Sequence, residues 1–191
     1  MKKLLNFITL LIIAGLVLYH FDFFSDNSNE KSKISENMPK KEYQFIDIVK
    51  NAVDKSGRAS NDLQKSAIKT ERTEGVCGLI KGDLSAVNWV GKVAKLDSNN
   101  DGKGVLVIEI SKNISLKTWN NSLSDGRDKT LIEKDSELFQ KALSLKKGDL
   151  VKFSGNFIHS DDDCIREASV TLSGGVDSPD FIFKFRDISL L

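Results

Sequence analysis

The sequence has few of the side chains that enzymes use for chemistry. It contains two histidines and two cysteines among 191 residues, and only His159 lies outside the N-terminal segment. It lacks a glycine-rich phosphate loop, a Gly-x-Ser-x-Gly motif and a His-Glu-x-x-His zinc motif. Its carboxylate pairs are expected in solvated loops, where no apolar surroundings raise a pKa. The sequence therefore predicts that the protein is not an enzyme and has no cofactor.

The chain also lacks a basic excess. Lys and Arg number 28 and Asp and Glu number 27, which gives a formal net charge of +1. Proteins whose main task is to hold nucleic acid usually carry a strong basic excess, so nucleic acid is a disfavoured partner. The composition, with 40% hydrophobic and 29% charged residues, is typical of a folded domain. The length that remains after the N-terminal segments suits a single core.

One long apolar run is present, near the N-terminus. It extends from Leu4 to Phe24, follows two lysines and ends in aromatic residues around His20. This length spans a bilayer, and no small-residue cleavage site follows it. We therefore predict a transmembrane anchor over residues 1–24; a cleaved secretory signal and a buried core helix are the alternatives. The positive-inside rule then predicts a single-pass protein of the bacterial inner membrane with an extracytoplasmic C-terminal domain.

The next two segments differ in composition. Residues 25–41 are mostly Asp, Asn, Ser, Glu and Lys, and because they bury little apolar surface we predict a flexible tether. Residues 42–75 are predicted to form helices that pack on the following domain. One helical face carries Phe45, Ile48, Val49, Ala52 and Val53. A second, weaker helix capped by Ser60 or Asn61 would carry Leu63, Ala67 and Ile68.

From about Val87 onward the apolar period changes to two, which indicates half-buried strands. Alternating segments lie at 106–110, 114–118, 151–157, 168–172 and 181–185, and a short amphipathic helix is predicted over 138–143. Three strands, a helix and further strands is the order of an OB-fold, a small partly open Greek-key barrel. We therefore predict a mainly β fold with accessory helices, in which residues 76–191 form an OB-like barrel.

Several motifs resemble those of the bacterial OB-fold proteins of the tRNA_anti-like family. The resemblance covers about residues 85–188 and lies in Trp89–Val93, the segments 105–110 and 114–118, Leu145–Gly155 and Phe181–Phe185. It implies a barrel similar to anticodon-binding domains and supplies no catalytic residues. Many such proteins look like lipoproteins, but no cysteine follows the apolar run here, which excludes a lipid anchor.

The two cysteines, Cys77 and Cys164, are enough for one disulfide in an exported domain. We predict this bridge, with two buried free thiols as the alternative. Closing a loop of 87 residues would stabilise the fold by about 4–5 kcal/mol at most. A redox centre is not expected, because neither cysteine belongs to a Cys-x-x-Cys motif.

Two acidic loops are expected to flank the ligand face of the barrel. The second carries Asp161, Asp162 and Asp163, and an outer strand face between the loops carries Lys117 and Trp119. We predict that these five residues bind the ligand, although a strand tryptophan is also common in a core. Carboxylates at both edges would repel a phosphate backbone, which favours a protein or peptide partner.

The first acidic loop carries Asp97, Asn99 and Asp101, spaced like the first three ligands of a calcium loop. The second half of that motif is absent, because Ile108 occupies the position of the bidentate glutamate. A solvated hairpin turn is the favoured interpretation, and a calcium site is the alternative.

Three functions remain open on this evidence. The leading hypothesis is a membrane-anchored, non-catalytic OB-type binding module for a protein or peptide in the cell envelope. The second is a nucleic-acid-binding barrel at the envelope, which rests on fold analogy alone. The third is a structural spacer without a ligand.

Overall fold

The computed structural model of the chain describes residues 29–30 and 32–191. The predicted anchor over residues 1–24 lies outside this range. Within the described residues, no helix has both the length and the apolar character needed to cross a membrane. Residues 29–30 and 32–37 are helical, and the chain divides after Asn37, so that Met38–Leu191 forms one compact unit.

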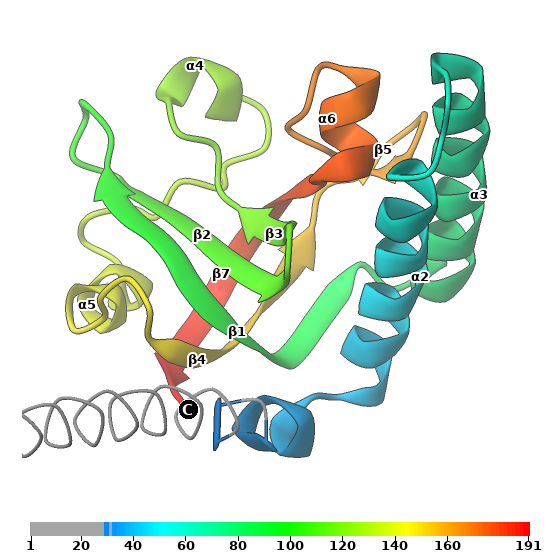
Figure 1. The fold of residues 1–191 in the computed structure, drawn as a ribbon. Coiled ribbons are helices and arrows are strands. Elements are labelled where there is room, and N and C mark those ends of the chain that lie inside the picture. Colours follow the sequence, from blue (N-terminus) through cyan, green and yellow to red (C-terminus); the bar gives the residue numbers. More distant parts are fainter. Residues whose placement is uncertain (1–28, 31) are drawn as a thin grey trace, which may run out of the picture. The chain divides into compact units, whose positions relative to one another are not determined.

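A closed five-stranded barrel is the centre of this unit (Figure 1). Its strands are β1 (Ser85–Ser98), β2 (Gly104–Ser111), β3 (Ile114–Lys117), β4 (Leu150–Phe157) and β7 (Asp180–Leu190). They are hydrogen-bonded in the order β1-β2-β3-β7-β4, and β4 returns to β1. The β3–β7 pair is parallel and the other four pairs are antiparallel. The protein therefore has a mainly β core, consistent with an OB-like barrel, and the barrel is closed rather than partly open.

Within Met38–Leu191 the helices occupy three places (Figure 1). Two precede the barrel, two lie between β3 and β4, and one precedes β7: α2 (Lys40–Ser56), α3 (Asp62–Ile80), α4 (Ser122–Asp125), α5 (Glu137–Leu143) and α6 (Leu172–Asp177). The connection from β4 to β7 also contains a small hairpin of β5 (His159–Ser160) and β6 (Cys164–Ile165).

Aromatic rings fill the barrel. The alternation along β7 turns Phe181, Phe183 and Phe185 into the core, where Phe153 and Phe157 of β4 contact them edge to face. Gly155 of β4 permits this packing, because a Cβ there would overlap a β7 carbonyl oxygen and the ring of Phe183. The two strands therefore approach more closely than a larger residue would allow.

Helix α2 contributes one ring to the same core. Phe45 is fully buried, and its ring centroid lies 5.4 Å from that of Trp89, 5.1 Å from Phe157 and 5.2 Å from Phe181. Val49 and Ala52 lie on the same face and are also buried. Three of the five residues of the predicted face are therefore buried, and α2 belongs to the same compact unit as the barrel.

Several predicted boundaries differ from the structure. Helix α2 begins at Lys40, inside the predicted tether, and α3 continues to Ile80, beyond the predicted start of the barrel segment at residue 76. Asn61 is the N-cap of α3, as expected, but Leu63 is 81% exposed, so the residues of α3 that pack inward lie later in the helix. The strand predicted over 168–172 is wrong, because Leu172 begins α6.

Candidate functional site

The outer face of β3 brings together two of the predicted ligand residues. Beyond Lys117 the chain stays extended for one more residue, since the Thr118 N–H donates to the Leu106 carbonyl at 3.0 Å. Leu116 and Thr118 are buried on the inner side, so Lys117 and Trp119 project from the opposite, outer side. Both are half-buried.

The indole of Trp119 is held by residues that follow it in the chain. Its Nε1–H donates to the Asp128 carboxylate at 2.8 Å, and its backbone N–H donates to the Thr130 hydroxyl at 2.9 Å. The same Asp128 carboxylate lies 3.3 Å from Nε of Arg166. The ring is therefore fixed in orientation, with an ion pair beside it.

Lys117 is paired as well. Its Nζ lies 3.1 Å from the Asp180 carboxylate at the start of β7. Five residues thus form what we call the β3 cluster: Lys117, Trp119, Asp128, Arg166 and Asp180. The sequence alone did not indicate Asp128, Arg166 or Asp180, because these residues approach β3 only once the chain has folded. Each cation of the cluster has a carboxylate partner, so the cluster adds little net charge.

The second acidic loop forms the turn of the β5–β6 hairpin, and this hairpin is attached to α3. The sulfurs of Cys77 and Cys164 are bonded, with the two Cα atoms 5.7 Å apart, which confirms the predicted disulfide. The Asp163 carboxylate lies 3.0 Å from Lys69 of α3, and Asp161 lies 3.2 Å from the His159 ring.

Among the described residues, no hydrogen bond or ion pair links Asp161, Asp162 or Asp163 to the β3 cluster. Asp163 binds the helical layer instead, through Lys69. The structure therefore does not show the predicted ligand residues as one site. Lys117 and Trp119 lie together in a defined geometry, and their role in ligand binding stays a prediction.

A buried ion pair attaches α3 to the same connection. The Arg72 and Glu167 side chains are in direct contact and are only 1% and 7% exposed, and Arg72 Nη1 also donates to the Gly175 carbonyl at 2.6 Å. Burial raises the pKa of Glu167 above its ordinary value, although the Arg72 guanidinium acts in the opposite direction. Helix α3 and the β4–β7 connection are thus joined by a disulfide, by this buried ion pair and by partly exposed ion pairs such as Lys69–Asp163 and Lys65–Asp177.

The first acidic loop connects β1 to β2. The Asn99 side-chain carbonyl accepts the backbone N–H of Asp101 at 3.0 Å and that of Lys103 at 2.9 Å. The N–H of Ser98 binds the Asp97 carboxylate and lowers the pKa of that group. The loop therefore uses its polar side chains to stabilise its own turn. The described residues contain no group of three or more His, Cys, Asp or Glu side chains suited to a metal, and the calcium alternative stays a prediction.

Glu42 is a buried carboxyl group in a helix, whereas the carboxylate pairs of the sequence were expected in solvated loops. It is 0% exposed, in the first turn of α2, and both carboxyl oxygens lie within 3.1 Å of the Val90 N–H. Burial raises its pKa from 4.5 to about 8, and the hydrogen bond from Val90 acts in the opposite direction. The sequence does hold a signal, since Glu42 lies three residues before Phe45 on the packing face.

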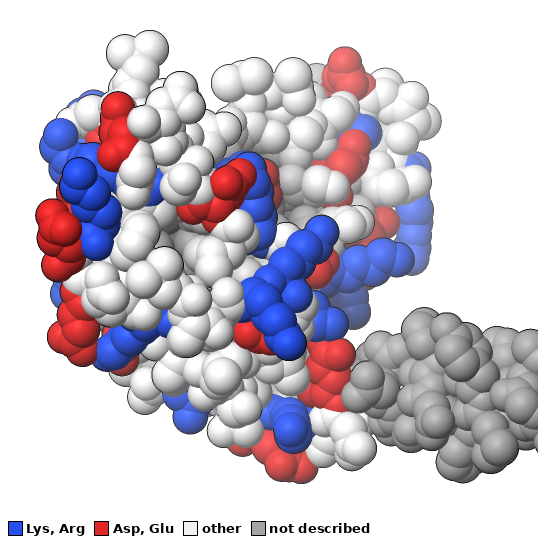
Figure 2. Space-filling model, turned by 90° about the vertical axis from the view of Figure 1, so that its left-hand side faces the viewer, with Lys and Arg blue, Asp and Glu red and all other residues white. Residues whose placement is uncertain are grey.

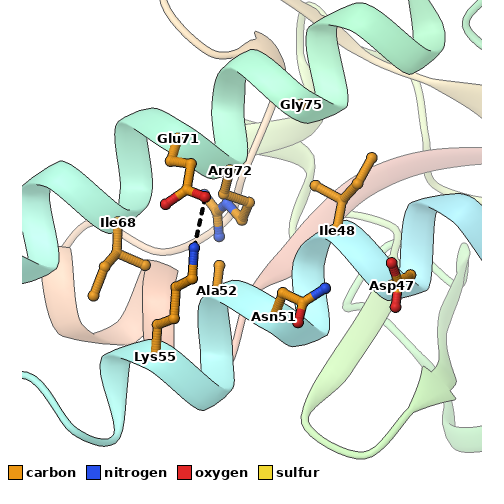
Figure 3. Close-up of a pocket in the computed structure, with 9 residues that line it drawn as sticks. All are labelled: Asp47, Ile48, Asn51, Ala52, Lys55, Ile68, Glu71, Arg72 and Gly75. Carbon is orange, nitrogen blue, oxygen red and sulfur yellow. Dashed lines mark hydrogen bonds and ion pairs between the residues drawn. The ribbon is translucent and has the colours of Figure 1, made fainter.

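A groove of about 490 Å³ lies between α2 and α3 (Figure 3). Figure 3 shows Lys55 and Glu71 approaching each other across it, with 2.6 Å between Nζ and the carboxylate. Farther along, a Cβ on Gly75 would lie 3.0 Å from the Ile48 side chain, so glycine allows the helices to pack closely there. The groove lining includes no histidine, serine or cysteine, and its polar groups are arranged for helix packing rather than for catalysis.

A second hollow, of about 660 Å³, borders the disulfide and is lined mainly by apolar groups of the α3 C-terminus and the loop that follows it. A third, of about 570 Å³, lies between the segment 129–133, α5 and β7.

No family model, curated protein or solved structure matches this chain.

Proposed function

We propose that the protein is a membrane-anchored, extracytoplasmic and non-catalytic binding module, built on an OB-fold barrel, that takes a protein or peptide partner in the envelope of a bacterium. The apolar run of residues 1–24 supports the anchor, which would make it a single-pass protein of the inner membrane. The disulfide supports an oxidising compartment.

The strand order supports the OB assignment. The third strand of the barrel pairs in parallel with the last one, β7, and α4 and α5 fill the connection from β3 to β4. A five-stranded barrel with a helix in this place is the arrangement expected of an OB-fold. The resemblance of residues 85–188 to the tRNA_anti-like family is in agreement with it.

The β3 cluster is the observation that carries the choice of partner. Its two cations, Lys117 and Arg166, already have carboxylate partners in Asp180 and Asp128, whereas affinity for nucleic acid depends on cations that neutralise phosphates. Figure 2 shows Lys and Arg side chains interspersed with Asp and Glu over one face of the molecule. In the β3 cluster itself, paired charges of both signs lie beside a fixed tryptophan, which suits a protein interface, where tryptophan is a frequent anchor.

Crosslinking in intact membranes tests this proposal. The full chain is expected to capture a defined protein, and Trp119→Ala should reduce that capture, whereas Leu123→Ala, at a position 93% exposed, should leave it unchanged. Thermal melts of both variants control for stability. Capture of nucleic acid alone would reject the proposal. Equal capture by both variants would show that Trp119 does not contact the partner, and capture of no partner would favour the structural spacer.

The half-buried ring of Trp119 favours single-stranded nucleic acid as a second candidate, because bases stack on aromatic rings. Retention of the full chain on single-stranded DNA at low salt, and its loss at high salt, would support that candidate. No retention at low salt would reject it.

A further inference from the structure

The hollow beside the last strand differs from the β3 cluster in its charge. We call it the β7 groove and define it by residues 129–133 and 136–138, which form one wall, and 184–186 of β7, which form the other. Lys129, Lys184 and Arg186 are exposed, and within the described part of the chain none of them has an ion pair or a side-chain hydrogen bond. These three cations can therefore pair with a ligand in the groove.

The carboxylates of the same groove are already bound. Glu133 lies 2.6 Å from Lys103, and Glu137 lies 2.8 Å from Lys141. Both lysines belong to the surroundings of the groove and do not line it. The acidic groups are therefore neutralised while the basic groups are not, and the charge that the groove presents to a ligand is positive.

The backbone of β7 offers a second feature. Its pairing with β3 covers Asp180–Ile182 only, whereas its pairing with β4 continues to Leu190. From Phe183 onward, no second strand of the described residues pairs with β7, so one edge of the strand borders the groove beside α5. Such an edge can accept an extended peptide through main-chain hydrogen bonds. Leu131, Ile132 and Phe185, all at most 5% exposed, supply an apolar floor.

We propose that the β7 groove binds an extended acidic segment of the partner protein. This inference rests on the proposed function and adds the chemistry of one segment of the partner and a second place of contact, apart from the β3 cluster. Charge complementarity supplies the orientation and the attraction, and the strand edge supplies the main-chain contacts. A nucleic acid fits less well, because the Phe185 ring that lines the groove is 4% exposed and offers no surface on which a base could stack.

Fluorescence anisotropy with the purified full chain in detergent tests the inference. The probe is a labelled peptide of alternating glutamate and valine, with a lysine–valine peptide and oligothymidylate as the comparison probes. Of the three probes, we expect only the acidic peptide to bind. Lys184→Glu combined with Arg186→Glu should weaken the binding of this peptide by about tenfold or more. The matched control is Lys112→Glu combined with Lys147→Glu, which changes the net charge equally at exposed positions outside the groove.

Each outcome has a distinct meaning. Equal loss of binding in both double variants would show a nonspecific charge effect and overturn the groove assignment. Failure of the acidic peptide to bind, with a protein still captured in the membrane crosslinking, would overturn the groove and leave the proposed function intact. Binding of oligothymidylate alone would overturn both. Circular dichroism of the variants confirms that the comparison concerns folded protein.

Discussion

Glu42 makes the stability of the domain depend on pH. The folded state raises its pKa from 4.5 to about 8, so the folded protein binds this proton more tightly than the unfolded chain does. The stabilisation from the proton is fully present below about pH 4.5 and is lost as the pH rises through about 8. At about 1.4 kcal/mol per pH unit, the whole effect is about 5 kcal/mol.

The variant Glu42→Gln keeps a carbonyl oxygen for the Val90 N–H and has no proton to lose. We expect the free energy of unfolding of the variant to lack this pH dependence. The difference in free energy of unfolding between the variant and the wild type should therefore change by about 3–4 kcal/mol between about pH 5 and pH 8. The variant should be the more stable protein at the alkaline end. Urea titrations at several pH values measure the difference.

The matched control is Glu74→Gln, at an exposed position of α3. Its difference from the wild type should stay within about 0.5 kcal/mol across the range. A Glu42→Gln difference that does not change with pH would refute the reasoning, because it would mean that this carboxyl titrates alike in the folded and unfolded chains.

Three further changes test how the domain is held together. Replacing Cys77 and Cys164 with serine, or reducing the wild type, should cost about 4–5 kcal/mol at most in thermal melts; an unchanged melting temperature would contradict the disulfide's role. Gly155→Ala should destabilise the barrel by about 3 kcal/mol or more, because the new Cβ has no room beside β7; a loss below about 0.5 kcal/mol would contradict the close strand packing. Arg72→Met should cost about 3–5 kcal/mol by leaving Glu167 buried without its partner, and adding Glu167→Gln should restore part of the loss; no recovery in denaturant titrations would show that the charge is not the cause.

The barrel strands could be predicted because alternation records burial directly. Phe181, Phe183 and Phe185 turn inward at every second residue, and β7 is the strand that this pattern indicates. The same rule failed at 168–172, where Val170 is 98% exposed. A competing signal was present, since the Thr171 hydroxyl accepts the Gly174 N–H as a helix N-cap.

The disulfide could be predicted from the expected oxidising compartment and the cysteine count, without knowledge of the fold. The surroundings of Trp119 could not, because Asp128 reaches the indole only through the folded loop after β3, and Arg166 reaches Asp128 only after the β4–β7 connection has folded against the barrel. Burial of Arg72 and Glu167 was hidden for the same reason: each is polar by sequence, and each finds its partner 95 positions away.

The disulfide also divides the chain into a covalent ring and two tails. Strands β1 to β4 lie between Cys77 and Cys164 and therefore inside the ring, whereas β7 lies outside it. A protease that cuts the β1–β2 loop once would leave two fragments joined through sulfur, which migrate as one species until a reductant separates them. Damage to the ring would thus leave the nicked molecule in one piece in an oxidising compartment, while a cut before β7 would release the closing strand of the barrel.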